Sequence, residues 1–414
     1  MNVTGIIAEY NPFHNGHCHQ LELVKQHCPD TYIIVVMSGS FCQRGEAALL
    51  SKWERADLAV QNGCDLVLEL PAVCAVRSAQ DFARGGVRLL SRLGIVNTLA
   101  FGSELADAKA LADLARAVNR EDVKQLLHQG LAEGHSYASA LCHALASATG
   151  LSEESLRQPN TILAIEYLRA LNEFPSATPI RPLPLQRTQV RHDDSRLTPG
   201  ITSAASIRLA LADGAPDWKT IQTAVPPAVF HSLRNAKENG LPDMEHLFRP
   251  LLCKLFRMDS DAFRSIYTVS EGLEHRLLKC MRQSENLAGL VRSSASARYP
   301  QSRIRRLLFY LLTEFTKIQA KEFDISGPLY ARVLALNDRG RILLRRIRQT
   351  SSLPVISKPG AHLDSRQLLL PPSGLSLCRQ QLKMDMLSTN LRGLTLPTPQ
   401  TNFPDLLTSP VYRR

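Results

Sequence analysis

The sequence predicts a doubly wound α/β fold followed by a mainly helical domain. In the first half, short β-branched runs alternate with segments of helical spacing, as in a parallel sheet covered by helices. Beyond Pro226, apolar residues recur instead at i, i+3 and i+4, which favours helices. The chain has 414 residues, 44% hydrophobic and 21% charged, which is typical of a globular protein with more than one core.

The strands of the first half are expected where apolar runs are short and continuous. Residues 31–37 are the clearest case, because a run rich in Ile and Val is typical of a parallel strand buried on both faces. Glycines or prolines close the neighbouring segments. The predicted strands are 3–9, 31–37, 65–70, 96–101 and an edge strand at 182–185; the predicted helices follow residue 14 and cover 53–61, 79–93, 162–171 and a segment ending at Leu211.

Three parts of the chain are expected from these patterns. Residues 1–215 form the Rossmann-like sheet domain, interrupted by a helical insertion at 105–150. Residues 216–360 form a basic helical domain, and 361–414 form a Pro-rich tail. Helical spacing in the second part is found at 261–269, 273–281, 302–316 and 342–347.

The net charge of +11 is concentrated in the second half. Residues 249–348 carry 20 Lys and Arg against 9 Asp and Glu, a difference that equals the whole excess. A polyanionic partner for this segment is the natural hypothesis, and a solvated helical surface is the alternative.

The sequence predicts neither a membrane protein nor a protein stabilised by disulfides. The chain shows neither a basic leader followed by an apolar run nor an apolar stretch long enough to span a bilayer, so a cytoplasmic protein is predicted. Its nine cysteines are odd in number and contain no C-x-x-C pair, which argues against a disulfide framework and against structural zinc.

The turn after the first predicted strand is the strongest candidate site. The strand breaks at Tyr10-Asn11-Pro12-Phe13 into His14-Asn15-Gly16-His17, and a helical pattern follows. A helix that starts above a sheet edge directs free N–H groups and its positive dipole end at a ligand, and polyphosphate fits. This is the HxGH spacing of adenylyl-transferring enzymes, in which His14 and His17 would donate hydrogen bonds as charge develops on the α-phosphate. Two surface histidines in a turn are the alternative.

Other segments that follow strands carry polar side chains. Ser203 opens a helix with Arg208 in it, and Arg187 lies upstream; phosphate binding and simple N-capping are both open for Ser203. Arg44, Lys52 and Arg55, in or after the loop that begins at residue 38, could hold phosphates or could be surface charge.

Taken together, several motifs resemble those of the tRNA(Met) cytidine acetate ligase family. They cover most of the chain: GIIAEYNPFHNGH at 5–17, MSGSFCQRGE at 37–46, FGSE at 101–104, QPNTILAIEYL at 158–168, SAASIR at 203–208, EGLE at 271–274, Arg298-Tyr299, Ser302-Arg303 and SLPVISK at 352–358. The set is far more specific than HxGH alone.

The resemblance implies a reaction and a ligand set. Acetate would be activated with ATP to acetyl-adenylate, with Mg²⁺ bridging to the pyrophosphate, and the acetyl group would pass to N4 of the wobble cytidine of elongator tRNA(Met). With such a substrate, Arg44, Lys52 and Arg55 could hold tRNA as well as phosphates. With Ser203 from the argument above, the expected ATP-binding residues are Ile7, Ala8, Glu9, Tyr10, Asn11, Pro12, Phe13, His14, Asn15, Gly16, His17, Cys18, His19, Gln20, Gly102, Asn160, Arg187 and Ser203.

Two other functions are compatible with the HxGH turn. A small-molecule adenylyltransferase would use the same turn, but the basic helical half would be unexplained. A non-catalytic tRNA-binding or ribosome-binding protein with a relic site is the other possibility. Acetate-dependent release of pyrophosphate separates the first from the ligase, and the effect of replacing both histidines separates the second.

Overall fold

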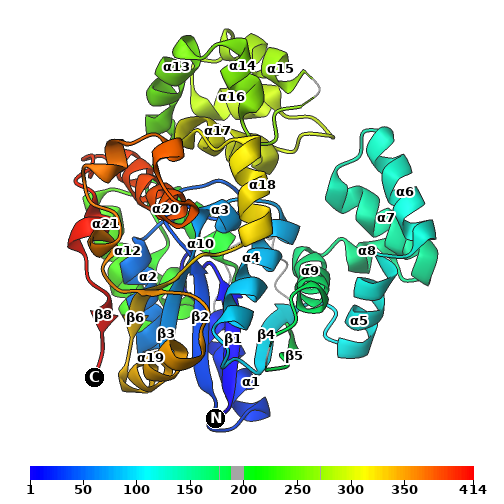
Figure 1. The fold of residues 1–414 in the computed structure, drawn as a ribbon, viewed down its shortest axis with the longest axis vertical. Helices are drawn as coiled ribbons and strands as arrows, with labels where there is room; N and C mark the ends of the chain where they lie inside the picture. The colour runs from blue at the N-terminus through cyan, green and yellow to red at the C-terminus, as the bar shows by residue number, and fades with distance from the viewer. Residues whose placement is uncertain (177, 188–199, 271) are drawn as a thin grey trace.

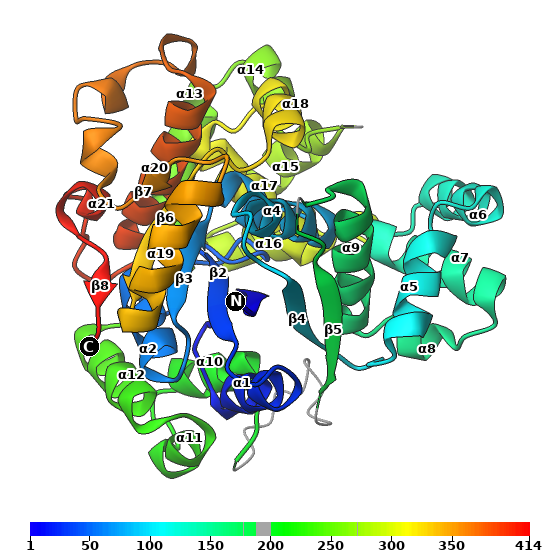
Figure 2. The ribbon, with the colours of Figure 1, turned by 60° about the horizontal axis from the view of Figure 1, so that its bottom comes forward.

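A single mixed sheet runs through the molecule (Figures 1 and 2). The computed structural model describes residues 1–176, 178–187, 200–270 and 272–414. The strand order is β5-β4-β1-β2-β3-β6-β7, with β8 paired to β6. Strands β1 to β5 are parallel, whereas β6 is antiparallel to β3. The strands are β1 Val3–Ala8, β2 Tyr32–Ser38, β3 Leu66–Leu70, β4 Thr98–Ser103, β5 Arg181–Gln186, β6 Ala331–Leu336, β7 Val355–Ile356 and β8 Val411–Tyr412.

Helices cover both faces of this sheet, which confirms the doubly wound prediction. Alternate residues of β2 enter different cores: Ile33 and Val35 pack with one helix layer, Ile34 and Val36 with the other. The first layer comprises α1 Asn15–His27, α2 Lys52–Gln61, α10 Ala204–Ala212, α11 Trp218–Ala224 and α12 Pro227–Asn239. The second includes α3 Ala72–Ala75, α4 Ala79–Arg92, α9 Pro159–Glu173 and α19 Asp338–Thr350.

Two groups of helices extend from this body (Figure 1). The predicted insertion at 105–150 is helical and lies to one side, with α5 Ala108–Ala117, α6 Glu121–Ala132 and α7 Tyr137–Thr149, and the short helix α8 Glu153–Leu156 follows it. Six helices of the basic segment form a cluster at one end of the molecule: α13 Phe248–Arg257, α14 Ser260–Ser265, α15 Leu273–Met281, α16 Leu287–Ser294, α17 Gln301–Thr313 and α18 Lys317–Ser326. The rest of the segment, β6 and α19, lies with the sheet instead. Short 3-10 turns and the helices α20 Leu377–Leu394 and α21 Pro404–Leu407 complete the chain.

The second half departs from the helical expectation in one respect. Strand β6 lies within the segment predicted to be helical, and its six residues are all buried beside β3. Strand β7 from the same segment and β8 from the tail also join the sheet, so its far edge is built by the C-terminal half. A short apolar run reads equally well as buried helix or buried strand, and tertiary pairing decided between them.

Two predicted helices are shorter than their apolar spacing indicated. The segment 261–269 is helical only to Ser265, and Thr268 has a positive φ of 66°. The segment 302–316 ends at Thr313, because Glu314 takes a left-handed conformation with φ of 54°. Among the described residues, no helix combines the length and the apolarity that crossing a membrane requires.

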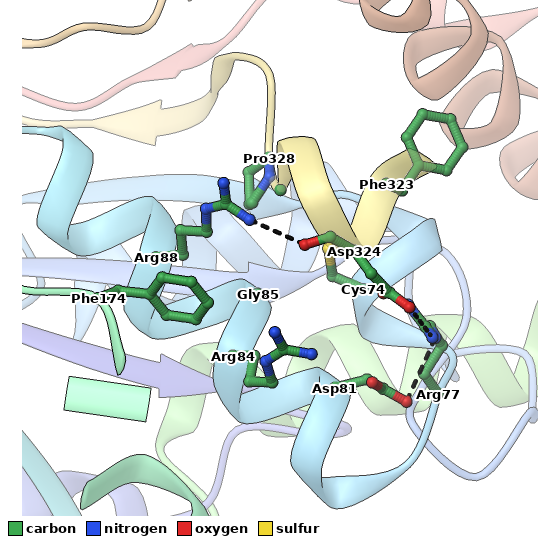
Figure 3. Close-up of a pocket in the computed structure, with 11 residues that line it drawn as sticks. Cys74, Arg77, Asp81, Arg84, Gly85, Arg88, Phe174, Phe323, Asp324 and Pro328 are labelled. Carbon is green, nitrogen blue, oxygen red and sulfur yellow. Dashed lines mark hydrogen bonds and ion pairs between the residues drawn. The ribbon is translucent and has the colours of Figure 1, made fainter. Parts of the chain in front are cut away.

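Arginines of α4 and of the turn before it join the basic cluster to the sheet domain (Figure 3). Arg88 donates to the carbonyl oxygen of Asp324 at 3.0 Å, near the end of α18. Arg77 forms ion pairs with the Asp324 carboxylate at 2.5 Å and with Asp81 at 3.3 Å. These groups line a pocket of about 270 Å³. Its charged side chains already have partners within the protein, so the pocket marks the contact between the basic cluster and the sheet domain and not a ligand site.

Candidate active site

The HxGH turn forms the first cap of α1. Strand β1 ends at Ala8 and the helix begins after its N-cap, His14. His14 Nδ1 accepts a hydrogen bond from the Gly16 N–H at 3.0 Å, and the His14 N–H donates to His17 Nδ1 at 3.2 Å. The two imidazoles thus form a reciprocal capping box, and their ring centroids lie 3.8 Å apart.

This arrangement sets the tautomer of both rings. Because each Nδ1 accepts a backbone N–H, a neutral ring must carry its proton on Nε2. Burial, with the nearby His14 and Arg187, holds the pKa of His17 well below its usual range, so His17 is neutral at physiological pH. Each histidine is therefore prepared to donate one Nε2–H hydrogen bond, without adding a fixed positive charge at His17.

Two cavities meet at these histidines, at the carboxyl ends of β1 and β4. The strand order reverses between β4 and β2 on either side of β1, so this is the topological switch point where α/β sheets bind ligands. The larger cavity has a volume of about 1330 Å³, including the space at its open mouth, and the narrower one has a volume of about 510 Å³. Both are lined by His14, His17, Gln20, Gly102 and Arg187.

Most of the predicted ATP-binding residues lie around these cavities. The larger one is also lined by Ile7, Ala8, Glu9, Tyr10, Asn11, Asn160 and Ser203, and the narrower one by Gly16 and His19. In the described part of the chain, Pro12, Phe13, Asn15 and Cys18 line neither. Phe13 is fully buried beside His17, and Asn15 Nδ2 donates to the Thr223 carbonyl at 2.8 Å, so these two side chains support the turn.

Ser203 caps α10 at the wall of the larger cavity. Its Oγ accepts the Ser206 N–H at 3.0 Å, so the capping role is present, and the first residues of α10 also face the cavity. Arg208 Nη1 donates to the Asn11 carbonyl at 2.7 Å, which ties α10 to the HxGH turn. The N–H groups at this helix start are directed at the same space as the two histidines.

The loop after β2 forms another part of the larger cavity. Cys42, Gln43, Arg44 and Glu46 line it. The Gln43 N–H donates to Glu9 Oε1 at 2.6 Å, and Glu46 pairs with Arg305 of α17 at 3.1 Å. Through this pair the basic helical cluster reaches the cavity edge.

Lys52 and Arg55 do not face a ligand, which corrects the suggestion that they could hold phosphates or tRNA. Lys52 is fully buried, and its Nζ lies 2.8 Å from Glu69 and 2.6 Å from Asp405. Arg55 is also fully buried and donates to the backbone carbonyls of Glu9 and Ser38 at 2.5 and 3.1 Å. Both cations hold the fold together beneath the site.

Glu104 organises the strand ends opposite this loop. Its carboxylate accepts from Asn160 Nδ2 at 2.6 Å and lies 3.9 Å from Arg187 Nε. Burial lowers the pKa of Arg187. At Gly102 a Cβ atom would lie 3.1 Å from the Arg187 side chain, so the bare backbone leaves room for that arginine.

The sequence patterns did not single out the apolar side of the larger cavity. Ala79 and Phe82 of α4, Phe101 of β4 and Leu163 and Tyr167 of α9 line it. On an amphipathic helix such residues are indistinguishable from core positions, so no signal in the spacing marked them.

Known proteins match this chain along its whole length. A profile of the HIGH Nucleotidyl Transferase family matches residues 1–403. The tRNA(Met) cytidine acetate ligase of Syntrophomonas wolfei is 36% identical over 421 residues, which cover 99% of each chain. That of Alkaliphilus metalliredigens is 36% identical over 433 residues, covering 100% of this chain and 99% of the relative.

Solved structures agree with these sequence matches. The crystal structure of Thermotoga maritima TmcAL without ligand has a TM-score of 0.89 and 31% identity, with all of both chains covered. The form of that protein bound with alpha-thio ATP has a TM-score of 0.86 and 31% identity, covering 100% of this chain and 99% of the other. The chain belongs to the HIGH nucleotidyltransferase family and, within it, to the tRNA(Met) cytidine acetate ligases.

Proposed function

We propose that this protein is an ATP-dependent ligase that acetylates the wobble cytidine of elongator tRNA(Met) at N4, through an acetyl-adenylate intermediate. The observation that carries the proposal is the histidine pair. Both rings are fixed as Nε2–H donors where two cavities meet, in a chain related over its full length to ligases of that name.

The narrower cavity suits adenosine. Gly16 and Gly102 expose backbone to it, and Leu23, Leu185 and Ile201 provide apolar contacts for a purine. The α-phosphate would then lie beside His14 and His17, and the β- and γ-phosphates would extend into the larger cavity toward the start of α10. Arg208 and Arg44 on that side supply positive charge.

The chemistry then proceeds in two steps. An acetate oxygen attacks the α-phosphorus, a new P–O bond forms, and pyrophosphate leaves with the electron pair of the bond that breaks. The Nε2–H groups of His14 and His17 stabilise the charge that builds on the phosphate oxygens. The cytidine amine next attacks the acetyl carbon, AMP leaves, and the amine nitrogen loses one proton to solvent.

We propose that Mg²⁺ arrives with the ATP phosphates. Among the described residues, no group of three or more His, Cys, Asp or Glu side chains is arranged to hold a metal ion. Mg²⁺ in nucleotide enzymes is commonly held by substrate phosphates with one or two carboxylates, and Glu9 and Glu46 line the cavity. When bound, the ion would neutralise charge on the leaving pyrophosphate.

We assign the tRNA contacts to the basic helical cluster. Arg305 of α17 pairs with Glu46 at the cavity edge, so RNA held along this cluster could present a base to the larger cavity. We also propose a cytoplasmic location, which the tRNA substrate and the nine free cysteines support.

Two measurements test the proposal. Mass spectrometry of tRNA(Met), with and without the gene, should find N4-acetylcytidine at the wobble position only when the gene is present. ATP–pyrophosphate exchange by the purified protein should depend on acetate and not on a nucleotide or a pantetheine phosphate. Exchange that persists unchanged after His14→Ala and His17→Ala together would refute the role of the histidines.

A further inference from the structure

We propose that the apolar wall of the larger cavity holds the methyl group of acetate and limits the length of the acyl chain, with Leu163 as the specificity-determining residue. The wall comprises Ala79, Phe82, Phe101, Leu163 and Tyr167. The proposal deepens the acetate ligase function and rests on it.

The two helix layers give the cavity two chemically different walls. His14, His17, Ser203 and Arg208 come from α1 and α10, or cap them, on one face of the sheet. The apolar wall comes from α4, α9 and the side of β4 that packs with them, on the other face. Asn160 of α9 and Arg187, which follows β5, also line the cavity, so its second side is apolar along Ala79, Phe82, Phe101, Leu163 and Tyr167 and polar at its end. The two histidines and the start of α10 thus face a mainly hydrocarbon surface.

In-line displacement assigns one substrate to each wall. The attacking and leaving oxygens lie on opposite sides of the phosphorus in the transition state. Pyrophosphate needs the charged wall, where the start of α10 and Arg208 lie. Acetate must then approach from the opposite side, with its carboxylate toward the histidines and its methyl group toward the apolar wall.

Leu163 is the residue of this wall that can limit chain length. Phe82, Phe101 and Tyr167 are nearly fully buried, and the rings of Phe101 and Tyr167 support each other at a centroid distance of 5.5 Å. Leu163 and Ala79 also line the cavity, and they are only half-buried, so neither is held in a fully packed core. Of these two, Leu163 has the bulk to exclude an extra methylene.

Acyl selectivity in the tRNA-free half-reaction tests this assignment. The measurement is ATP–pyrophosphate exchange with acetate, propionate and butyrate, for the wild type, Leu163→Ala and the matched control Ile162→Ala. Ile162 neighbours Leu163 on α9 and packs against the same core, but it is not among the residues that line the cavity. In Leu163→Ala the propionate-to-acetate ratio of kcat/KM should rise on the order of 10- to 100-fold, and Ile162→Ala should retain the wild-type ratio.

The opposite substitution provides a second test that does not depend on Leu163→Ala folding. Ala79→Val fills the wall, so the formate-to-acetate ratio should rise while the KM for ATP stays unchanged. Unchanged acyl ratios in both variants would overturn the inference. So would unchanged ratios with a raised KM for tRNA, because the wall would then hold the cytosine. A wild-type protein that shows no acetate-dependent exchange would instead refute the proposed function itself.

Discussion

Replacing His17 by its two amide analogues separates its role in catalysis from its role in the helix cap. In His17→Asn, the amide oxygen occupies the region of Nδ1 and can still accept the His14 N–H, but the Nε2–H donor is lost. In His17→Gln, an amide N–H reaches toward the region of Nε2, and the amide oxygen can still accept the His14 N–H, as Gln319 does for Thr316 at the same position of the α18 capping box. In the native structure the distance between the His14 backbone nitrogen and His17 Nδ1 is 3.2 Å, so the hydrogen bond that closes the helix cap is present.

The two variants should differ in kcat of acetate-dependent exchange. Removing one donor that faces developing charge costs about 2.7–4 kcal/mol, so kcat of acetate-dependent exchange should fall on the order of 10²- to 10³-fold in His17→Asn. Its free energy of unfolding should stay close to that of the wild type. His17→Gln should retain more activity than His17→Asn, and its free energy of unfolding should also stay close to that of the wild type, because Gln at this position of a capping box accepts the N-cap N–H.

Exchange kinetics and urea unfolding at two pH values measure both effects. The folded state depresses the pKa of His17, so the unfolded chain binds more protons near pH 6. The stability that His17 contributes is therefore present above its unfolded pKa of about 6.5 and falls as the pH drops through that value. The free energies of unfolding of the wild type and His17→Asn should therefore be similar at pH 7.5, and at pH 5.5 the wild type should be the less stable of the two by about 1 kcal/mol, because Asn does not titrate. Wild-type exchange rates in His17→Asn would refute the donor role.

Two further predictions concern stability and RNA binding. Asp405→Asn removes the carboxylate that pairs with Lys52 and Arg332 in a fully buried cluster, and it should lower the free energy of unfolding in urea by about 3–5 kcal/mol. The exposed Asp113→Asn should cost less than about 1 kcal/mol. Because these cations lower the pKa of Asp405 to about 2, the wild-type advantage should shrink as the pH falls from about 4 toward 2, and an advantage that does not change over that range would contradict the pairing. The affinity for tRNA(Met) should fall steeply between 50 and 200 mM salt because residues 249–348 are strongly basic, and a flat dependence would exclude phosphate contacts as the main source of binding.

Local patterns predicted the nucleotide-binding half well. The strands near 31–37 and 65–70 were predicted to within a residue, because continuous β-branched runs leave few alternatives. The HxGH turn was placed at the start of a helix, and the structure adds that the histidines themselves cap it. The ATP-binding roles of the residues between Ile7 and Gln20, His14 and His17 included, stay predictions, as do those of Gly102, Asn160, Arg187 and Ser203.

Two features of the candidate site could not be predicted from spacing. Lys52 and Arg55 follow a polar loop and were interpreted as available to a ligand. Lys52 instead pairs with a carboxylate more than 300 residues away, and Arg55 donates to backbone carbonyls at the ends of β1 and β2. Leu163 and Ala79 follow the same apolar periodicity as core residues, yet they line a cavity.

The sequence by itself determined the parallel core of the sheet, the capped helix at His14 and the concentration of positive charge in the second half. These depend on periods, caps and composition, which act over a few residues. Only the tertiary structure decided that β6, β7 and β8 complete the sheet, that two cations turn inward and that a charged wall faces an apolar one. These features depend on which distant segments supply partners for buried strand edges and buried charges. The spacing of residues within one segment does not indicate which distant segment that will be.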